Sequence, residues 1–242
     1  MIKSIGRIFF FLLSVAATVN LSGCAVDEAA STGFTNPVLR QDRPDIPFQR
    51  VWIKPGTDFK NYRSIYIALV NTDYVIKSES WKTVGKIDDV QQDLAEAALY
   101  MRNSFINTFK QTPSNRFKIA IVPGPGALSL ELALVELVPN SPAMKTASLI
   151  PLYGLAVGAV DSVDPDTVAF EARIRDGKTG DIIMIFADRR KAKGNIVSVK
   201  NFTYYSHAYT LMDDWAKEFV AVLNKRPGET VEKSSGFELK PW

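Results

Sequence analysis

The stretch Thr167-Val-Ala-Phe-Glu-Ala-Arg-Ile-Arg175 decides the fold, together with the loop Asp176-Gly-Lys-Thr-Gly180 and the apolar run Asp181 to Asp188 that follow it. Apolar and charged side chains alternate along the first run, with Val168, Phe170, Ala172 and Ile174 on one face and Glu171 and Arg173 on the other. A period of two indicates a strand with one buried face. A short loop with two glycines between two such runs indicates a hairpin. The stretch therefore predicts an antiparallel pair of strands.

Three more strands are predicted before this hairpin. Ser64 to Val70 is apolar nearly throughout, which is typical of a central strand. Lys118 to Val122 is a second run, and Leu128 to Val138 alternates leucine with smaller or polar residues. The alternation slips at Val135-Glu136, and a slip of one position indicates a β-bulge or the effective end of the strand.

Two amphipathic helices complete the pattern, from Asp88 to about Gln111 and from about Tyr209 to Asn224. Each carries large apolar residues at the spacing of one helical stripe. The order is β-α-β-β-β-β-α, and one sheet face can cover both stripes. We predict an α+β fold, a single mixed, mostly antiparallel sheet with two amphipathic helices packed on one face. The first β-α-β unit is expected to form a parallel crossover.

The N-terminus has the layout of a secretory signal peptide, with Lys3 and Arg7 ahead of an apolar run from Ile8 to Val19. An uncleaved anchor helix is the alternative, but this run is shorter than the roughly 20 residues that span a bilayer. Leu21-Ser-Gly-Cys24 then resembles the lipobox of bacterial lipoproteins. That resemblance implies removal of residues 1–23, a diacylglycerol on the Cys24 sulfur and an acyl chain such as palmitate on its amino group. Ala25 in place of aspartate implies sorting to the outer membrane, facing the periplasm.

Four segments follow from this layout: the signal peptide 1–23, a lipidated N-terminus and flexible tether over 24–49, a globular domain over 50–226 and a polar C-terminal tail over 227–242. The tether has three prolines and no apolar period. The domain has the size of a single folding unit.

Composition excludes several classes of function. Loss of Lys3 and Arg7 with the signal removes two of the three excess positive charges, and a nearly neutral body argues against nucleic acid as a partner. Lipidation of Cys24 takes the only cysteine, which excludes disulfides and cysteine-ligated zinc or iron–sulfur clusters. The single His207 excludes zinc sites built on several histidines. We expect no cofactor.

Four landmarks carry a family resemblance: Trp52-Ile-Lys-Pro-Gly-Thr-Asp-Phe-Lys-Asn-Tyr62, Leu130-Glu-Leu-Ala-Leu134, Glu171-Ala-Arg-Ile-Arg-Asp-Gly-Lys-Thr-Gly-Asp181 and Trp215-Ala216. In this order, over about residues 35–225, they resemble the DUF3313 family of bacterial lipoproteins, a domain of unknown function. The resemblance implies an envelope lipoprotein and supplies no site residues.

Motifs that suggest catalysis have simpler explanations. Gly177-Lys-Thr179 lacks the earlier glycine and the following helix of a phosphate loop, so a hairpin turn is favoured. His207 lies beside no identifiable nucleophile, which favours a histidine at the start of the last helix or in its packing. Asp161, Asp164 and Asp166 lack calcium-loop spacing and a central glycine, which favours a solvated loop.

Two stretches are candidate interaction surfaces. The first is the apolar run Leu149 to Val160, which either covers the core or lies exposed as a patch for a partner. The second is the basic cluster Arg189 to Lys193, which either contacts anionic lipid or is a solvated loop. The residues proposed to make contact are Leu149, Leu152, Tyr153, Leu155, Val157, Arg189, Arg190, Lys191 and Lys193.

Three hypotheses about function follow. The first is a non-enzymatic accessory or binding module, held to the membrane by Cys24 and contacting an envelope protein or anionic lipid. The second is a carboxylate-dependent hydrolase of the envelope that uses Glu131 and Glu171 on neighbouring strands. The third, a purely structural role in the envelope, cannot be separated from the first by sequence.

Overall fold

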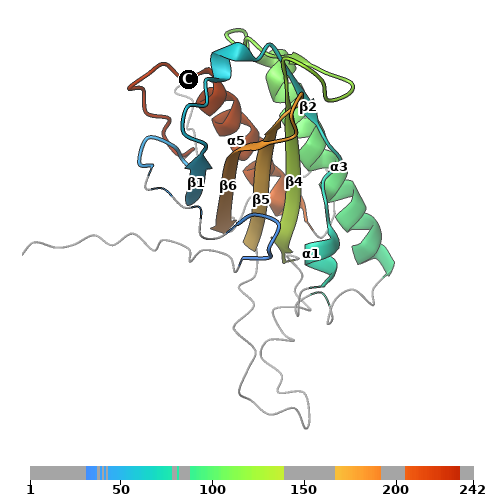
Figure 1. Cartoon of the computed structure of the whole chain (residues 1–242). Helices are drawn as coiled ribbons and strands as arrows, with labels where there is room; N and C mark the ends of the chain where they lie inside the picture. Colours follow the sequence, from blue (N-terminus) through green and yellow to red (C-terminus); the bar gives the residue numbers. More distant parts are fainter. Residues whose placement is uncertain are drawn as a thin grey trace, which may run out of the picture.

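A computed structural model of the chain describes residues 31–36, 39, 41, 43–77, 81, 88–138, 167–191 and 205–234. One sheet runs through it, with the long helices behind the sheet in the view of Figure 1. The strands are β1 (Arg50–Ile53), β2 (Ser64–Ile67), β3 (Lys118–Ile119), β4 (Ala127–Leu137), β5 (Thr167–Asp176) and β6 (Ile182–Lys191). The helices are α1 (Asp73–Ile76), α3 (Asp88–Gln111) and α5 (Ser206–Asn224), with a short 3-10 turn, η1 (Phe59–Asn61).

The sheet has six strands in the order β1-β6-β5-β4-β2-β3. β1, β6, β5 and β4 pair antiparallel with one another in this order, whereas β2 pairs in parallel with both β4 and β3. The prediction of one mixed, mostly antiparallel sheet is confirmed. The parallel pairing of β2 with β3, which α3 connects, is the predicted crossover.

The β5–β6 hairpin forms where the sequence predicts it. Asp176 begins the turn, and its Oδ1 accepts hydrogen bonds from the backbone N–H groups of Lys178 at 2.7 Å and Thr179 at 2.8 Å. Gly177 is required because a Cβ there would lie 2.4 Å from the carbonyl oxygen of Gly124. Gly177-Lys-Thr179 is therefore a hairpin turn against the neighbouring loop.

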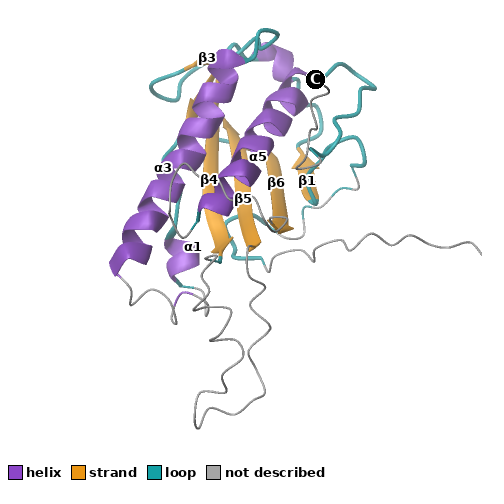
Figure 2. Ribbon diagram, turned by 180° about the vertical axis from the view of Figure 1, so that it is seen from behind, coloured by secondary structure: helices purple, strands orange, loops and turns teal. Residues whose placement is uncertain are grey.

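The two long helices cover one face of the sheet, as Figure 2 shows from behind. Their apolar stripes meet the inward residues of β5, and Val168, Phe170, Ala172 and Ile174 are all fully buried. Trp215 of α5 lies with its ring centroid 4.5 Å from that of Phe170, and Phe219 stacks on Phe186 at 4.9 Å. Each buried large apolar side chain stabilises the fold by roughly 1.5–3 kcal/mol, so these contacts fix α5 to the sheet. The Phe105 ring of α3 lies 5.7 Å from that of Phe219, which joins the two helices.

The β-bulge lies where the sequence predicts it, and two strands end earlier than predicted. The register of β4 against β5 shifts between Leu134 and Glu136, which confirms the predicted bulge. β3 is shorter than the predicted run to Val122, and β2 ends at Ile67 rather than Val70. The last β2–β3 hydrogen bond is from Ala120 N–H to the Ile65 carbonyl at 2.8 Å, and Pro123, close behind, has no N–H to extend the ladder.

The predicted flexible tether is wrong for the part that the structure describes. Phe34, Ile46 and Phe48 are buried, and the Phe48 ring lies 4.8 Å from that of Phe186. Isolated apolar residues without a period can bury as much surface as a periodic run, which is why the pattern missed them. β1 begins directly after this segment and pairs with β6.

The predicted polar tail is exposed over residues 227–230 but contacts the domain over residues 231–234. The backbone N–H of Val231 donates to the Asp45 carbonyl at 3.1 Å, and Lys233 pairs with Asp188 at 3.2 Å. Residues 231–234 therefore belong to the domain. In the described part of the chain, no helix combines the length and apolarity that a membrane crossing requires.

Candidate functional site

A buried carboxylate lies on the sheet face opposite the helices. Glu171 of β5 has no exposed side-chain surface. Its Oε2 accepts from the backbone N–H and the hydroxyl of Thr35, at 2.9 Å each, and from the hydroxyl of Thr32 at 3.2 Å. Its Oε1 accepts from the backbone N–H of Thr32 at 3.2 Å and from Arg50 at 3.4 Å. We call residues 32–35 the N-terminal arm and these contacts the Glu171 clamp.

The arm fits the sheet through one aromatic side chain and one glycine. Phe34 packs in a small apolar cluster with Ala133, Val135 and Ala169, and its ring meets that of Tyr74 edge-on at 5.9 Å. Gly33 has φ +86°, a conformation that other residues rarely adopt. This local turn lets the threonines on either side reach the same carboxylate.

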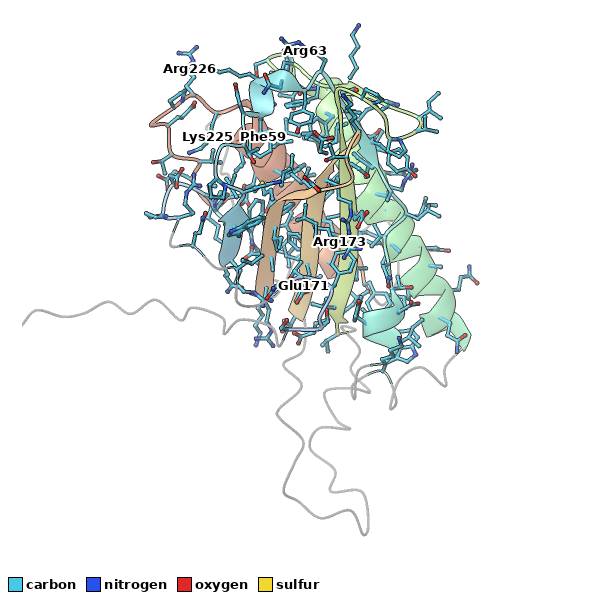
Figure 3. The ribbon with its side chains drawn as sticks, viewed as in Figure 1. Phe59, Arg63, Glu171, Arg173, Lys225 and Arg226 are labelled. Carbon is cyan, nitrogen blue, oxygen red and sulfur yellow. The ribbon has the colours of Figure 1, made fainter. Side chains whose placement is uncertain are left out.

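Arginines pair with the other carboxylates on this face. Glu131 lies between Arg173 and Arg175, with the Arg175 Nε at 3.0 Å. The Arg173 guanidinium also covers the Phe34 ring at 4.2 Å, so it links Glu131 to the arm. Figure 3 shows Arg173 above Glu171 on this face of the sheet.

A second ionic cluster lies on the inner face between β6 and α5. Arg190 donates to Asp188 at 2.6 Å and holds Glu218 through two nitrogens, at 2.5 and 3.0 Å. The indole N–H of Trp215 donates to Asp188 at 2.9 Å. Burial alone would lower the pKa of the Arg190 guanidinium, but its bond to Glu218 and the charge of Asp188 raise that pKa above its ordinary value. The cluster therefore holds α5 to β6 through charged groups removed from solvent.

Comparison with known proteins shows which family has this sequence pattern. The model of the family described as "Protein of unknown function (DUF3313)" matches residues 30–219, which include the arm, the sheet and most of α5. The chain belongs to the DUF3313 family. The matched range begins just ahead of the arm.

Likeness to solved structures is weak. Two PelC dodecamers from Paraburkholderia phytofirmans are similar to this DUF3313 chain. One, a point variant, has 14% identity and a TM-score of 0.38 and covers 73% of this chain and 97% of its own. The other has 12% identity and a TM-score of 0.39 and covers 73% and 96%. No curated protein matches the chain. At these scores the likeness supports no statement about function.

The geometry of the DUF3313 chain does not suit hydrolysis by Glu131 and Glu171. The register places Arg173 opposite Glu131 and Ala133 opposite Glu171, so the two carboxylates do lie on one face. A hydrolytic pair must reach the substrate and a water molecule from both carboxyl groups. The arm covers Glu171 completely, and Glu131 is held between two guanidinium groups. Both carboxylates therefore act as structural anchors.

The predicted basic surface is wrong for two of its arginines. Arg190 points into the inner ionic cluster and is buried, and Arg189 pairs with Glu136 at 2.7 Å on the other face. The period-two alternation of β6 extends to Lys191, which puts neighbouring basic residues on opposite faces. Lys191 is exposed. The remaining candidates, Leu149, Leu152, Tyr153, Leu155, Val157 and Lys193, lie outside the described residues.

The other sequence candidates bring no reactive groups together. His207 lies in the first turn of α5, as expected for a histidine at the start of a helix. Asp161, Asp164 and Asp166 lie outside the described residues. Within the described ranges, no group of three histidine, cysteine or acidic side chains is arranged to hold a metal ion.

Sequence reasoning missed the Glu171 clamp. The partners are separated by well over one hundred residues, and threonines in a polar segment give no periodic signal. A glutamate on an outward strand position normally indicates solvent exposure. The available hint was Phe34, a large aromatic residue in a stretch otherwise read as tether.

Proposed function

We propose that this DUF3313 chain is a lipoprotein of the outer membrane, facing the periplasm, which acts as a non-enzymatic binding module. The Leu21-Ser-Gly-Cys24 sequence and the apolar run before it support lipid attachment at Cys24. Several acyl chains, each contributing about 0.8 kcal/mol per buried methylene, hold a protein stably on a bilayer.

The observation that carries this proposal is the position of the arm. Thr32 is fixed to Glu171, so the folded body begins eight positions after Cys24 in the chain. A fully extended chain of that length spans at most about 28 Å. As a flexible coil it spans about 16 Å root-mean-square. A tether running to residue 49 would reach roughly 25–30 Å. The clamp therefore favours a body held close to the bilayer, with the arm-covered face tied to the anchor.

A binding role is supported by how the carboxylates are used. The clamp occupies Glu171, two arginines hold Glu131, and the inner cluster encloses Asp188 and Glu218. In each case the acidic group joins segments of the chain that are far apart in sequence. Such groups stabilise a surface and its orientation at the membrane.

Fractionation of cells that produce the full-length chain tests the proposal. We expect the native protein in the outer-membrane fraction and a Cys24→Ala variant outside it. The Ala25→Asp variant keeps the cysteine and is the matched control, expected to stay lipidated but in the inner membrane. A Cys24→Ala variant that remains acylated in the outer membrane would contradict the proposal.

A further inference from the structure

Exposed large apolar side chains gather at one edge of the sheet. In the described part of the chain these residues are Leu69 (78% exposed), Ile76 (47%), Leu99 (54%), Ile121 (92%) and Val122 (67%). Leu69 follows the end of β2, and Ile121 and Val122 follow the end of β3, the strand beside it. Soluble domains commonly expose single apolar residues, but a contiguous group marks an interaction site.

These residues lie at the ends of β2 and β3 and on α3, the long helix between those two strands in the chain. Arg102 of α3 donates its Nε–H to the Ile67 carbonyl at 3.1 Å, and Leu99 lies three residues earlier, on the same side of that helix. Leu69 follows Ile67 by two positions. Ile119 pairs with Ile65, and Ile121 follows that pair by two residues, just beyond the ladder hydrogen bond from Ala120 to Ile65. We call Leu69, Leu99, Ile121 and Val122 the edge patch.

The edge patch lies along an open side of the sheet. β3 is the outermost strand on this side and has only two residues. Ile121 and Val122 continue from it as the most exposed apolar pair in the described residues. A sheet edge offers backbone donors and acceptors to an extended segment of another chain, while apolar neighbours contact its side chains.

The charges beside the edge patch are positive. The backbone N–H of Lys118 donates to the Arg63 carbonyl at 2.9 Å, which puts these two residues side by side at the start of the edge. Burial, followed by the charge of Arg63, lowers the pKa of Arg116, and Asp58 offsets part of this effect. Figure 3 shows Arg63 at the same end of the molecule as Phe59. Of the described acidic groups, none forms a salt bridge with Arg63, Arg102, Arg116 or Lys118.

We infer that the edge patch binds an extended, acidic segment of another protein, which adds to the sheet beside β3. Apolar side chains of that segment would contact Ile121 and Val122, and its carboxylates would contact Lys118, Arg63 and Arg102. This inference rests on the proposed binding role and specifies the chemistry of the partner.

Charge and position favour this occupant over two others. A second copy paired through the same edge about a two-fold axis would bring like charges together. A bilayer does not pair with the backbone groups of the edge as another strand would. Lys118 pairs with Ser64 and so lies level with Ala127, six residues along β4 from Ala133, the partner of Glu171. That is about 20 Å from the clamp that ties the body to the anchor.

Site-specific photo-crosslinking in cells tests the inference with the full-length lipidated chain. A benzoylphenylalanine replaces Ile121 in one strain and Ile76, the exposed apolar residue outside the edge patch, in the matched control. We expect a heterologous adduct from position 121 and none from position 76. Mass spectrometry should map the link to an extended segment that carries acidic residues. Lys118→Glu should reduce the adduct at least tenfold, and exchange of the mapped acidic residue for lysine should restore it.

Other products would overturn the inference. An adduct of two copies of this chain would assign the edge to self-association, and a lipid adduct would assign it to the bilayer. Absence of an adduct at 121, or an adduct that Lys118→Glu leaves unchanged, would also refute it. Membrane fractionation of the same cells separates this result from failure of lipid anchoring, because a protein found outside the membrane fraction contradicts the proposed function itself.

Discussion

Thr35 donates both its backbone N–H and its hydroxyl to one oxygen of Glu171, at 2.9 Å each. Two bonds from one residue to a fully buried carboxylate fix the arm in position and orientation. The Glu171 clamp therefore makes the segment nearest the proposed lipid anchor part of the folded domain.

Removal of the clamp carboxylate should destabilise the whole domain. Glu171→Ala leaves the Arg50 guanidinium and the donors of Thr32 and Thr35 buried without their acceptor. Loss of one partner of a buried ion pair costs about 3–5 kcal/mol. Urea unfolding followed by tryptophan fluorescence should show a decrease of this size in the free energy of unfolding. Glu131→Gln, in a partly exposed pair, is the control and should cost about 1 kcal/mol or less. An equal loss of unfolding free energy in the two variants would show that the clamp contributes no more to stability than a partly exposed ion pair.

Disruption of the inner ionic cluster should lower the free energy of unfolding by a similar amount. Arg190→Met leaves Glu218 without its ion-pair partner and Asp188 with Lys233 alone, between β6 and α5, which should cost about 3–5 kcal/mol. Lys217→Met removes the mostly exposed partner of the 3.8 Å pair with Asp214 and should change stability by about 0.5 kcal/mol or less. Thermal unfolding of both variants measures the difference. A native melting temperature for Arg190→Met would contradict the burial of this arginine.

Replacement of Asp214 should have the opposite effect on stability. Burial raises the pKa of its carboxyl, with nearby Glu218 adding to the shift. A carboxyl whose pKa is higher in the folded state binds protons on folding, so its ionised form opposes folding at neutral pH. Asp214→Asn should therefore raise the melting temperature at pH 7, and the advantage should shrink as the pH falls through the raised pKa. A variant that is less stable than the native protein at pH 7 would contradict this.

Acid should weaken the hairpin turn. The hydrogen bond from the Tyr62 hydroxyl, together with turn N–H groups, lowers the pKa of Asp176, so its stabilising effect is present above the unfolded value of about 3.9 and is lost as the pH falls through the folded pKa. Burial, followed by the bond to Asp176, raises the pKa of Tyr62 to about 12. Absorbance titration of Asp176→Ala should show one tyrosine shifted back toward pH 10. An unchanged titration curve would show that the tyrosine is not coupled to this carboxylate.

The sequence predicted the elements whose side chains repeat. Alternation in β4 and β5 and the stripes of α3 and α5 each report a single buried face, so the strands, the helices and their packing on one side could be derived. The bulge after Leu134 appeared as a slip in the same pattern. The parallel crossover to β3 followed from the order of elements.

Features built from single residues could not be derived. Phe34, Ile46 and Phe48 bury apolar surface without any period, and β1 has only four residues. The sheet face to which Arg190 points depended on how far β6 extends, because successive residues of a strand point to opposite faces. The clamp depends on contacts between the arm and a strand far away in sequence, which a single sequence does not encode locally.

The distance between the body and the bilayer tests the central claim most directly. Neutron reflectometry on a supported bilayer carrying the full lipidated chain can measure this gap for the native protein and for Gly33→Pro. Proline cannot adopt φ +86°, so this variant should release the arm while every side chain of the sheet remains. The next fixed point is then Gln41, whose backbone N–H bonds to the Val51 carbonyl at 2.8 Å.

We predict that the mean gap increases from about 16 Å in the native protein to about 23 Å in Gly33→Pro. Gly124→Ala, a substitution into open space, should leave it unchanged. The same gap for the native protein and Gly33→Pro, or no attachment of the native protein to the bilayer, would contradict the account.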